Sequence, residues 1–190
     1  MKRHKPYGLD YAKNTGQILT EINNHALFAV VDKPNQTDPK YITYDIACNE
    51  DFALHSKYYN WKNIFGFFKE HPKAKATLAT KIIPDNFLEY NPEEKVRIRF
   101  SLMPQSLSTD LEPNTPKIID RIKAINRFRD AGYDVHINYS PVIYYRDFKK
   151  DYLKLFDLVD KHVEDKNNVL SEVIFLTHNK DKHEYNEEND

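Results

Sequence analysis

The stretch KVRIRFSLMP, residues 95–104, decides between the fold classes that this sequence allows. Its side chains alternate, with Val96, Ile98 and Phe100 in one row and Arg97, Arg99 and Ser101 in the other. A period of two predicts a β-strand with one apolar and one polar face. Strands buried on both sides of a parallel sheet read instead as continuous apolar runs. The polar face of this strand therefore has to meet a polar interior or water.

Two further segments repeat the pattern. KATLATK, residues 75–81, has a row of Thr77, Ala79 and Lys81, and DVHINYSPVIYY, residues 134–145, has a row of His136, Asn138 and Ser140. Because unpaired buried charges are costly, three such rows on consecutive parallel strands have to share one wet interior. The pattern favours an arc of a (β/α) barrel with a polar interior over an open doubly wound sheet or the apolar interior of the eight-fold barrel.

Helical patterns separate the predicted strands. Trp61, Ile64, Phe65 and Phe68 follow the spacing i, i+3, i+4 and i+7. Further helices are predicted for residues 15–28, for 84–90 as a turn or two, for 115–131 with Thr115-Pro116 at its start and Gly132 as its stop, and for 148–163. With strands at 41–48 and 171–178, this alternation predicts a parallel sheet with right-handed crossovers.

Composition sets the class of protein. The chain has 190 residues, a formal charge of -1, 40% hydrophobic residues and one cysteine. These values predict one domain, residues 1–180, with a polar tail at 181–190, and they exclude a disulfide framework. No stretch approaches the roughly 20 apolar residues of a membrane span, and no secretory signal is recognisable, so we expect a cytoplasmic protein without membrane contact. The first strand would have a bare edge, which suggests a further segment upstream.

Six separated motifs carry a resemblance. In order they are ACNEDFALH, ATLATK, VRIRFSLMPQ, LEPNTP, DAGYDVHINYSPVI and EVIFLTHN. With them the chain resembles the spore photoproduct lyase family of radical S-adenosylmethionine enzymes. The resemblance implies an α/β fold, a partial (β/α)6 radical-SAM-type barrel of which this chain covers roughly strands two to six. It also implies radical lysis of a carbon-carbon bond, in DNA photolesion repair or on a related substrate, and DNA would be a partner in the first case only.

The family's cofactors are S-adenosylmethionine and a [4Fe-4S] cluster. The cluster passes one electron to S-adenosylmethionine and so cleaves it to a 5'-deoxyadenosyl radical. A Cys-x3-Cys-x2-Cys loop holds that cluster, and a chain with one cysteine cannot contain it. We therefore expect an upstream segment or a subunit to carry the cluster loop, and this chain alone to be inactive. The alternative is a non-catalytic remnant or binding module with the same barrel-like fold.

The resemblance assigns roles to three residues. Cys48 matches the cysteine that is thought to return a hydrogen atom to the substrate radical, while Lys81 and Ser101 match positions that contact S-adenosylmethionine. Without the resemblance, Cys48 reads as a small buried hydrophobe, Lys81 as a lysine at a strand end and Ser101 as a turn hydroxyl. Asn49 and Glu50 replace the threonine and serine of the spore enzymes, which leaves the substrate open.

Other residues allow more than one interpretation. Asp51 is predicted to cap a helix. Arg97 and Arg99 suit either an anionic ligand or structural ion pairs. A third function, a metal-dependent hydrolytic barrel, would use Asp45, His136 and His178, although no paired-histidine motif accompanies them.

Overall fold

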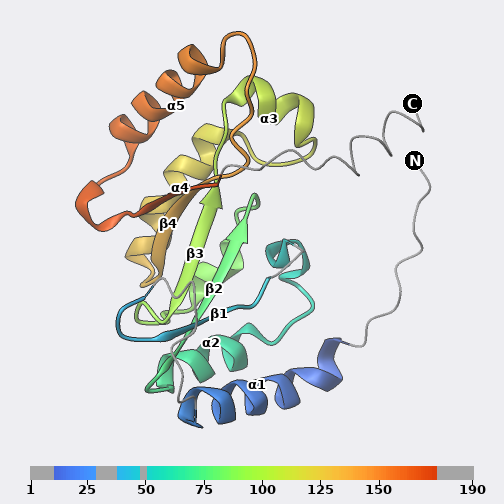
Figure 1. The fold of residues 1–190 in the computed structure, drawn as a ribbon. Coiled ribbons are helices and arrows are strands. Elements are labelled where there is room, and N and C mark those ends of the chain that lie inside the picture. The colour runs from blue at the N-terminus through green and yellow to red at the C-terminus, as the bar shows by residue number, and fades with distance from the viewer. Residues whose placement is uncertain (1–10, 29–37, 48–50, 175–190) are drawn as a thin grey trace, which may run out of the picture.

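The computed structural model describes residues 11–28, 38–47 and 51–174, and Figure 1 shows their arrangement. The strands are β1 (Ile42–Asp45), β2 (Ala74–Thr80), β3 (Val96–Ser101), β4 (Asp134–Tyr139) and β5 (Ser171–Val173). The α-helices are α1 (Tyr11–Phe28), α2 (Trp61–Glu70), α3 (Gln105–Leu111), α4 (Ile118–Asp130) and α5 (Phe148–His162). Short 3-10 helices are η1 (Phe52–His55), η2 (Asp85–Glu89) and η3 (Lys166–Asn168).

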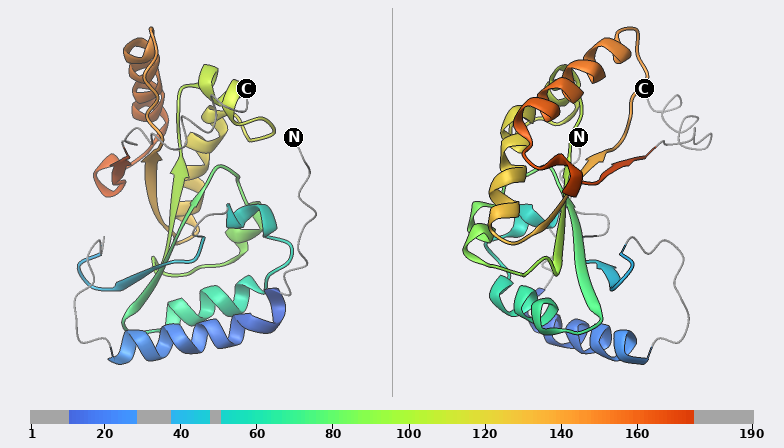
Figure 2. Two further views of the ribbon diagram at one scale, coloured as in Figure 1. Left: turned by 45° about the vertical axis from the view of Figure 1, so that its right-hand side comes forward. Right: turned by 90° about the vertical axis from the view of Figure 1, so that its left-hand side faces the viewer.

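The five strands form one parallel sheet in the order β1-β2-β3-β4-β5. Each strand thus pairs with its successor in the chain, as in a (β/α) barrel. In a doubly wound sheet the strand order would reverse at one point. The second view in Figure 2 shows α1, α2, α4 and α5 along one side of the curved sheet. The predicted partial barrel is confirmed, and β1 and β5 are the edge strands among the described residues.

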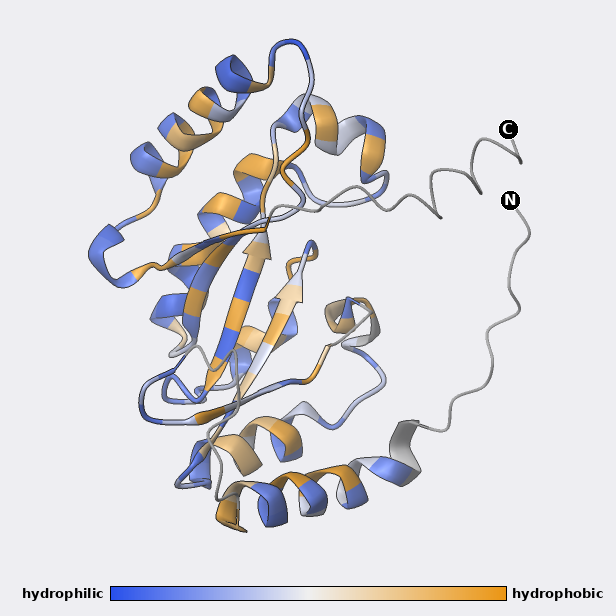
Figure 3. Cartoon of the chain, viewed as in Figure 1, coloured by the Kyte–Doolittle hydropathy of each residue, from blue (hydrophilic) through white to orange (hydrophobic). Residues whose placement is uncertain are grey.

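The strand register sorts the side chains into two faces. Arg97 lies opposite Thr77 and Asp134, and Arg99 lies opposite Ala79 and His136, so the three predicted polar rows share one face. We call this the inner face; it consists of Thr43, Asp45, Lys75, Thr77, Ala79, Arg97, Arg99, Ser101, Asp134, His136, Asn138 and Glu172. The alternation along β3 is visible in Figure 3. The prediction of a common polar side is confirmed.

The outer face packs against the helices. Leu78, Ile98 and Phe100 are fully buried there. On α2, Trp61, Ile64, Phe65 and Phe68 are all buried, as their spacing predicts. Trp61 and Phe65 contact Phe87 of η2 with ring centroids 4.6 and 5.0 Å apart. This aromatic cluster holds α2 and η2 on the sheet and leaves the opposite face for polar groups.

Several boundaries differ from the predicted ones. The helix α4 begins at Ile118 and not at Pro116, and Thr115 donates its hydroxyl hydrogen to the Glu112 carbonyl at 2.7 Å. The seven-residue helix α3 has no apolar period long enough to predict it. Gly132 does end α4, with φ at 87°. No helix in the described part of the chain is long and apolar enough to cross a membrane.

Candidate functional site

Lys81 and Ser101 lie at the same edge of the sheet. Ser101 is the last residue of β3, and Lys81 directly follows β2 in the polar row of Thr77 and Ala79. The carboxyl ends of parallel barrel strands form the edge where ligands bind in this architecture. Lys81 is partly exposed, with 41% of its side chain accessible, and Ser101 is buried. The Ser101 hydroxyl has no hydrogen-bond partner within the residues described.

Two buried side chains connect these positions. Lys81 Nζ lies 2.8 Å from Glu112 Oε1, and Glu112 Oε2 lies 2.9 Å from Nη1 of Arg121 on α4. The same Arg121 nitrogen donates to the Ser101 carbonyl at 3.0 Å. Arg121 also donates from Nε to the Pro116 carbonyl at 3.0 Å and from Nη2 to the Thr115 hydroxyl at 2.6 Å. Arg121 and Glu112 therefore fix the lysine head group relative to the end of β3.

The sequence analysis missed both linking residues. Glu112 belongs to the motif LEPNTP, which was the one signal that could have singled it out. Arg121 stands between Asp120 and Ile122 on a predicted amphipathic helix, where an arginine normally faces solvent. Its exposed fraction is 0%, and only the meeting of α3, α4 and β3 explains that burial.

The Asp51 carboxylate connects the segment after β1 to the end of β2 through hydrogen bonds. Its Oδ1 accepts hydrogen bonds from Ala53 N at 3.2 Å and from the Thr80 hydroxyl at 2.8 Å, and its Oδ2 accepts from Lys81 N at 2.7 Å. The predicted N-cap is thus confirmed. The tie to β2 was not predicted. Cys48, Asn49 and Glu50 lie outside the described residues, so the role of Cys48 stays a prediction.

We expect Asp51→Ala to lower the free energy of unfolding by about 1–2 kcal/mol, because it removes an N-cap and the hydrogen bonds to Thr80 and Lys81 at the end of β2. Urea unfolding of the variant measures this loss. Asp85→Ala is the matched control, because Asp85 forms an exposed ion pair with Arg127 and should change stability by less than about 0.5 kcal/mol. Equal effects of the two substitutions would contradict the anchoring role of Asp51.

The opposite end of the inner face contains a network of buried ion pairs. Asp134 Oδ2 lies 2.6 Å from Lys75 Nζ and 2.7 Å from Arg97 Nε. Asp38 Oδ2 lies 2.9 Å from Lys75 Nζ and 3.2 Å from Arg97 Nη2. Burial alone would raise the pKa of Asp134, but hydrogen bonds from His136 and Lys75 outweigh it and hold that pKa well below its usual range. For Arg97, the structural interpretation is therefore the correct one.

Arg99 and the proposed metal ligands are also paired. Arg99 Nη2 donates to Asp45 Oδ2 at 2.7 Å, and Arg99 Nη1 lies 3.6 Å from Glu172 Oε2. His136 Nε2 lies 3.0 Å from Asp134 Oδ1. Within the described ranges no three His, Cys, Asp or Glu side chains form a metal-binding group. His178 lies outside those ranges, so the hydrolytic-barrel hypothesis gains no support from the described residues.

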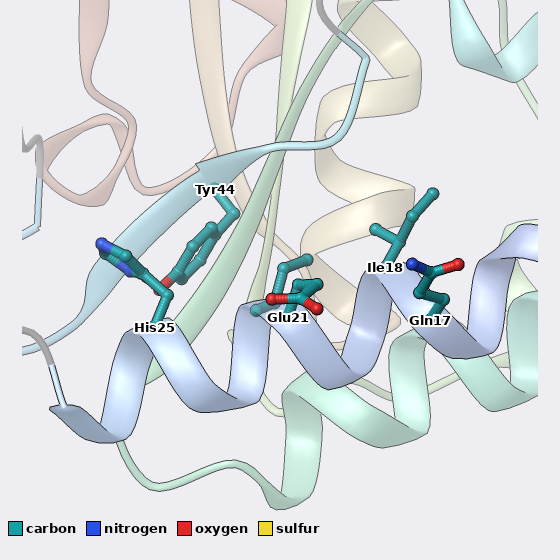
Figure 4. A pocket seen from close by; sticks show the side chains of 6 residues that line it. Gln17, Ile18, Glu21, His25 and Tyr44 are labelled. Carbon is teal, nitrogen blue, oxygen red and sulfur yellow. The ribbon is translucent and has the colours of Figure 1, made fainter.

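A separate hollow lies between α1 and β1 (Figure 4). It has a volume of about 350 Å³ and is lined by Gln17, Ile18, Glu21, Ile22, His25 and Tyr44. Tyr44 belongs to the outer face, and its hydroxyl lies 2.7 Å from His25 Nδ1. This hollow is therefore on the other side of the sheet from Lys81 and Ser101.

The five parallel strands, each paired with its successor, form a half-barrel with a polar inner face, and this fold defines the class as a partial radical-SAM-type barrel. The family model described as spore photoproduct lyase matches residues 7–186. The chain belongs to the spore photoproduct lyase family.

Individual relatives are distant. Spore photoproduct lyase of Bacillus subtilis (strain 168) is 23% identical over 146 residues, which cover 75% of this chain and 43% of the relative. A cysteine-to-alanine mutant of spore photoproduct lyase with the dinucleoside spore photoproduct has a TM-score of 0.77 at 19% identity, over 91% of this chain and 50% of that one. A double mutant with bound AdoMet and the same dinucleoside gives 0.76 at 19% identity and the same coverage. These structures establish the fold, and the chain spans about half their length.

Proposed function

We propose that this chain forms the cofactor- and substrate-binding arc of a radical S-adenosylmethionine lyase that acts on a carbon-carbon linked lesion in DNA or on a related substrate in the cytoplasm. The observation that carries the proposal is the joint fixation of Lys81 and Ser101 at the carboxyl edge through Glu112 and Arg121. The family membership and the AdoMet and dinucleoside spore photoproduct in a similar structure support it.

The residues at the edge fit S-adenosylmethionine. Glu112 forms an ion pair with Lys81, and the ammonium group keeps N–H donors for the carboxylate of the methionine part. The Ser101 hydroxyl can donate to the same carboxylate or to the ribose. Glu112 also balances the lysine charge, so the lysine is held in place before the cofactor arrives. Bound S-adenosylmethionine supplies the radical that starts the reaction.

The residues of this chain do not fit the iron-sulfur cluster. Three thiolates are needed and the 190 residues contain one cysteine, so we assign the cluster to an additional segment or subunit. The proposed role of Cys48 needs no cluster contact. Its S–H bond breaks homolytically, the hydrogen atom joins the substrate carbon radical, and a thiyl radical remains on sulfur.

We expect Lys81→Met to weaken S-adenosylmethionine binding by about 10- to 100-fold, because a hydrogen-bonded charge on the carboxylate is lost. Isothermal titration calorimetry of the chain with S-adenosylmethionine measures this change. Lys62→Met, on the exposed side of α2, is the matched control and should bind like the parent. Equal affinities of Lys81→Met and the parent would contradict the assignment.

A reconstitution experiment separates the lyase from the binding module, which the single cysteine favours as the second candidate function. The chain is incubated anaerobically with iron, sulfide and reductant, alone and with a peptide that carries a three-cysteine loop. Cleavage of S-adenosylmethionine only with the peptide supports the proposed enzyme. Binding without cleavage in both mixtures would leave the non-catalytic binding module.

A further inference from the structure

Three polar groups on the inner face keep unused hydrogen-bonding atoms although they are buried. His136 Nδ1, Asn138 Oδ1 and Arg99 Nε each have no hydrogen-bond partner among the described residues. His136 and Asn138 are only 3% and 6% exposed. Buried polar atoms are paired in the great majority of cases, so three unpaired ones in one place require an explanation.

The strand register brings these groups close to one another. Arg99 lies opposite His136 on the neighbouring strand, and Asn138 follows His136 by two residues on the same face. Paired strands are about 4.8 Å apart, and residues two apart along a strand are separated by about 7 Å. The three side chains are therefore neighbours on the inner face. Asn138 also lies opposite Ser101, so the group continues from the carboxyl edge into the inner face.

The ion pairs around the group exclude a simple anion as the ligand. Lys75, Arg97 and Arg99 pair there with the carboxylates Asp38, Asp45, Asp134 and Glu172. The buried Lys95 interacts with Lys75 and Asp38 and is a fourth cation against these four carboxylates. The surroundings thus have no excess of positive charge. An anion offers only acceptors, which would leave the Asn138 oxygen without a donor.

The unused atoms match a ligand with both donors and acceptors on one edge. Arg99 Nε offers an N–H, and Asn138 Oδ1 offers a lone pair. In the neutral tautomer whose Nε2–H donates to Asp134, His136 Nδ1 offers a second lone pair. Nucleobases present adjacent ring nitrogens, carbonyl oxygens and amino groups in such combinations.

We propose that Arg99, His136 and Asn138 form a subsite that binds the edge of a nucleobase inside the half-barrel. This inference rests on the proposed function, in that both the cofactor and a DNA lesion contain such bases. It adds three ligand-binding residues to Lys81 and Ser101. Asp134 acts as a positioning residue, since it fixes the tautomer and orientation of the His136 ring.

The test uses the full chain labelled with 15N-histidine, titrated separately with thymidine, cytidine, adenosine and guanosine. The His136 ring signal is identified by its loss in His136→Phe. We expect at least one nucleoside to shift the His136 Nδ1 resonance saturably, and its identity to distinguish a pyrimidine from an adenosyl group. No shift with any of the four nucleosides would overturn the proposal.

Asn138→Leu supplies a second, independent readout. The substitution removes an unsatisfied buried amide oxygen and keeps a similar shape, so we expect Tm without ligand to rise by about 2–4 °C while nucleoside affinity falls at least about tenfold. Asn63→Leu, at an exposed position of α2, should leave the affinity unchanged. A lower Tm with unchanged affinity would show that Asn138 is structural.

The two proposals fail separately. Nucleoside binding needs neither the cluster nor cleavage of S-adenosylmethionine, so a nucleoside shift without cleavage leaves the subsite standing. Cleavage in the reconstituted mixture without any nucleoside shift would support the proposed enzyme and overturn the subsite.

Discussion

Replacement of Arg121 by methionine is expected to lower the free energy of unfolding by about 3–5 kcal/mol. Arg121 is completely buried, and its partner Glu112 has only 3% of its side chain exposed. Removing the guanidinium leaves the glutamate charge with Lys81 alone and removes donors from the Ser101 and Pro116 carbonyls. Methionine fills a similar volume, so the loss reports on charge and hydrogen bonds more than on packing.

Urea unfolding of Arg121→Met and of two companion variants tests this result. Arg127→Met, on the same helix, removes an exposed ion pair and should cost less than about 0.5 kcal/mol. The double variant Arg121→Met with Glu112→Leu removes both buried charges and should recover part of the loss. A loss below about 1 kcal/mol for Arg121→Met would show that the pair does not fix the carboxyl edge.

Replacement of Asp134 by asparagine is expected to cost about 3 kcal/mol at neutral pH, because Lys75 and Arg97 then share a single buried carboxylate, Asp38. The effect should depend on pH. The folded-state pKa of Asp134 is lowered, so its contribution is fully present above the ordinary aspartate pKa of about 4 and is lost as the pH falls below it. The difference between parent and variant should therefore shrink on acidification.

Unfolding in urea at pH 7, 5, 4 and 3 measures this dependence, because these pH values lie on both sides of the ordinary aspartate pKa of about 4. Asp157→Asn is the control, because Asp157 is exposed on α5 and should follow the parent at every pH. Asp38 has a lowered pKa as well, in spite of its burial, because of Lys75 and two backbone amides. Some acid sensitivity should consequently remain in Asp134→Asn. A parent-to-variant difference that does not change with pH would contradict the network.

Local sequence patterns correctly predicted the features that depend only on residues close together in the sequence. The period of α2 identified its four buried residues, and alternation along β2, β3 and β4 identified the polar face. Both follow from the repeat geometry of one helix or strand and need no tertiary information. Gly132 and Asp51 were likewise predictable, because a helix stop and a cap depend on a few adjacent residues.

The start of α4 was predicted wrongly because Thr115 had a stronger partner elsewhere. Its hydroxyl bonds to Glu112 and Arg121, so it is not free to cap the helix. The short α3 is a related case, since seven residues cannot show a period and their helix is stabilised by contacts with other elements.

The sequence by itself determined that this chain forms a parallel α/β arc with one polar face, and its motifs placed Lys81 and Ser101 on that face. Only the tertiary structure decided which polar residues pair and which stay unpaired. Arg97 is neutralised by Asp38, which is 59 residues away, whereas His136 and Asn138 retain unused atoms. The physical reason is that burial and ion pairing depend on which side chains the fold brings within a few ångströms of one another, and the spacing along one strand does not contain that information.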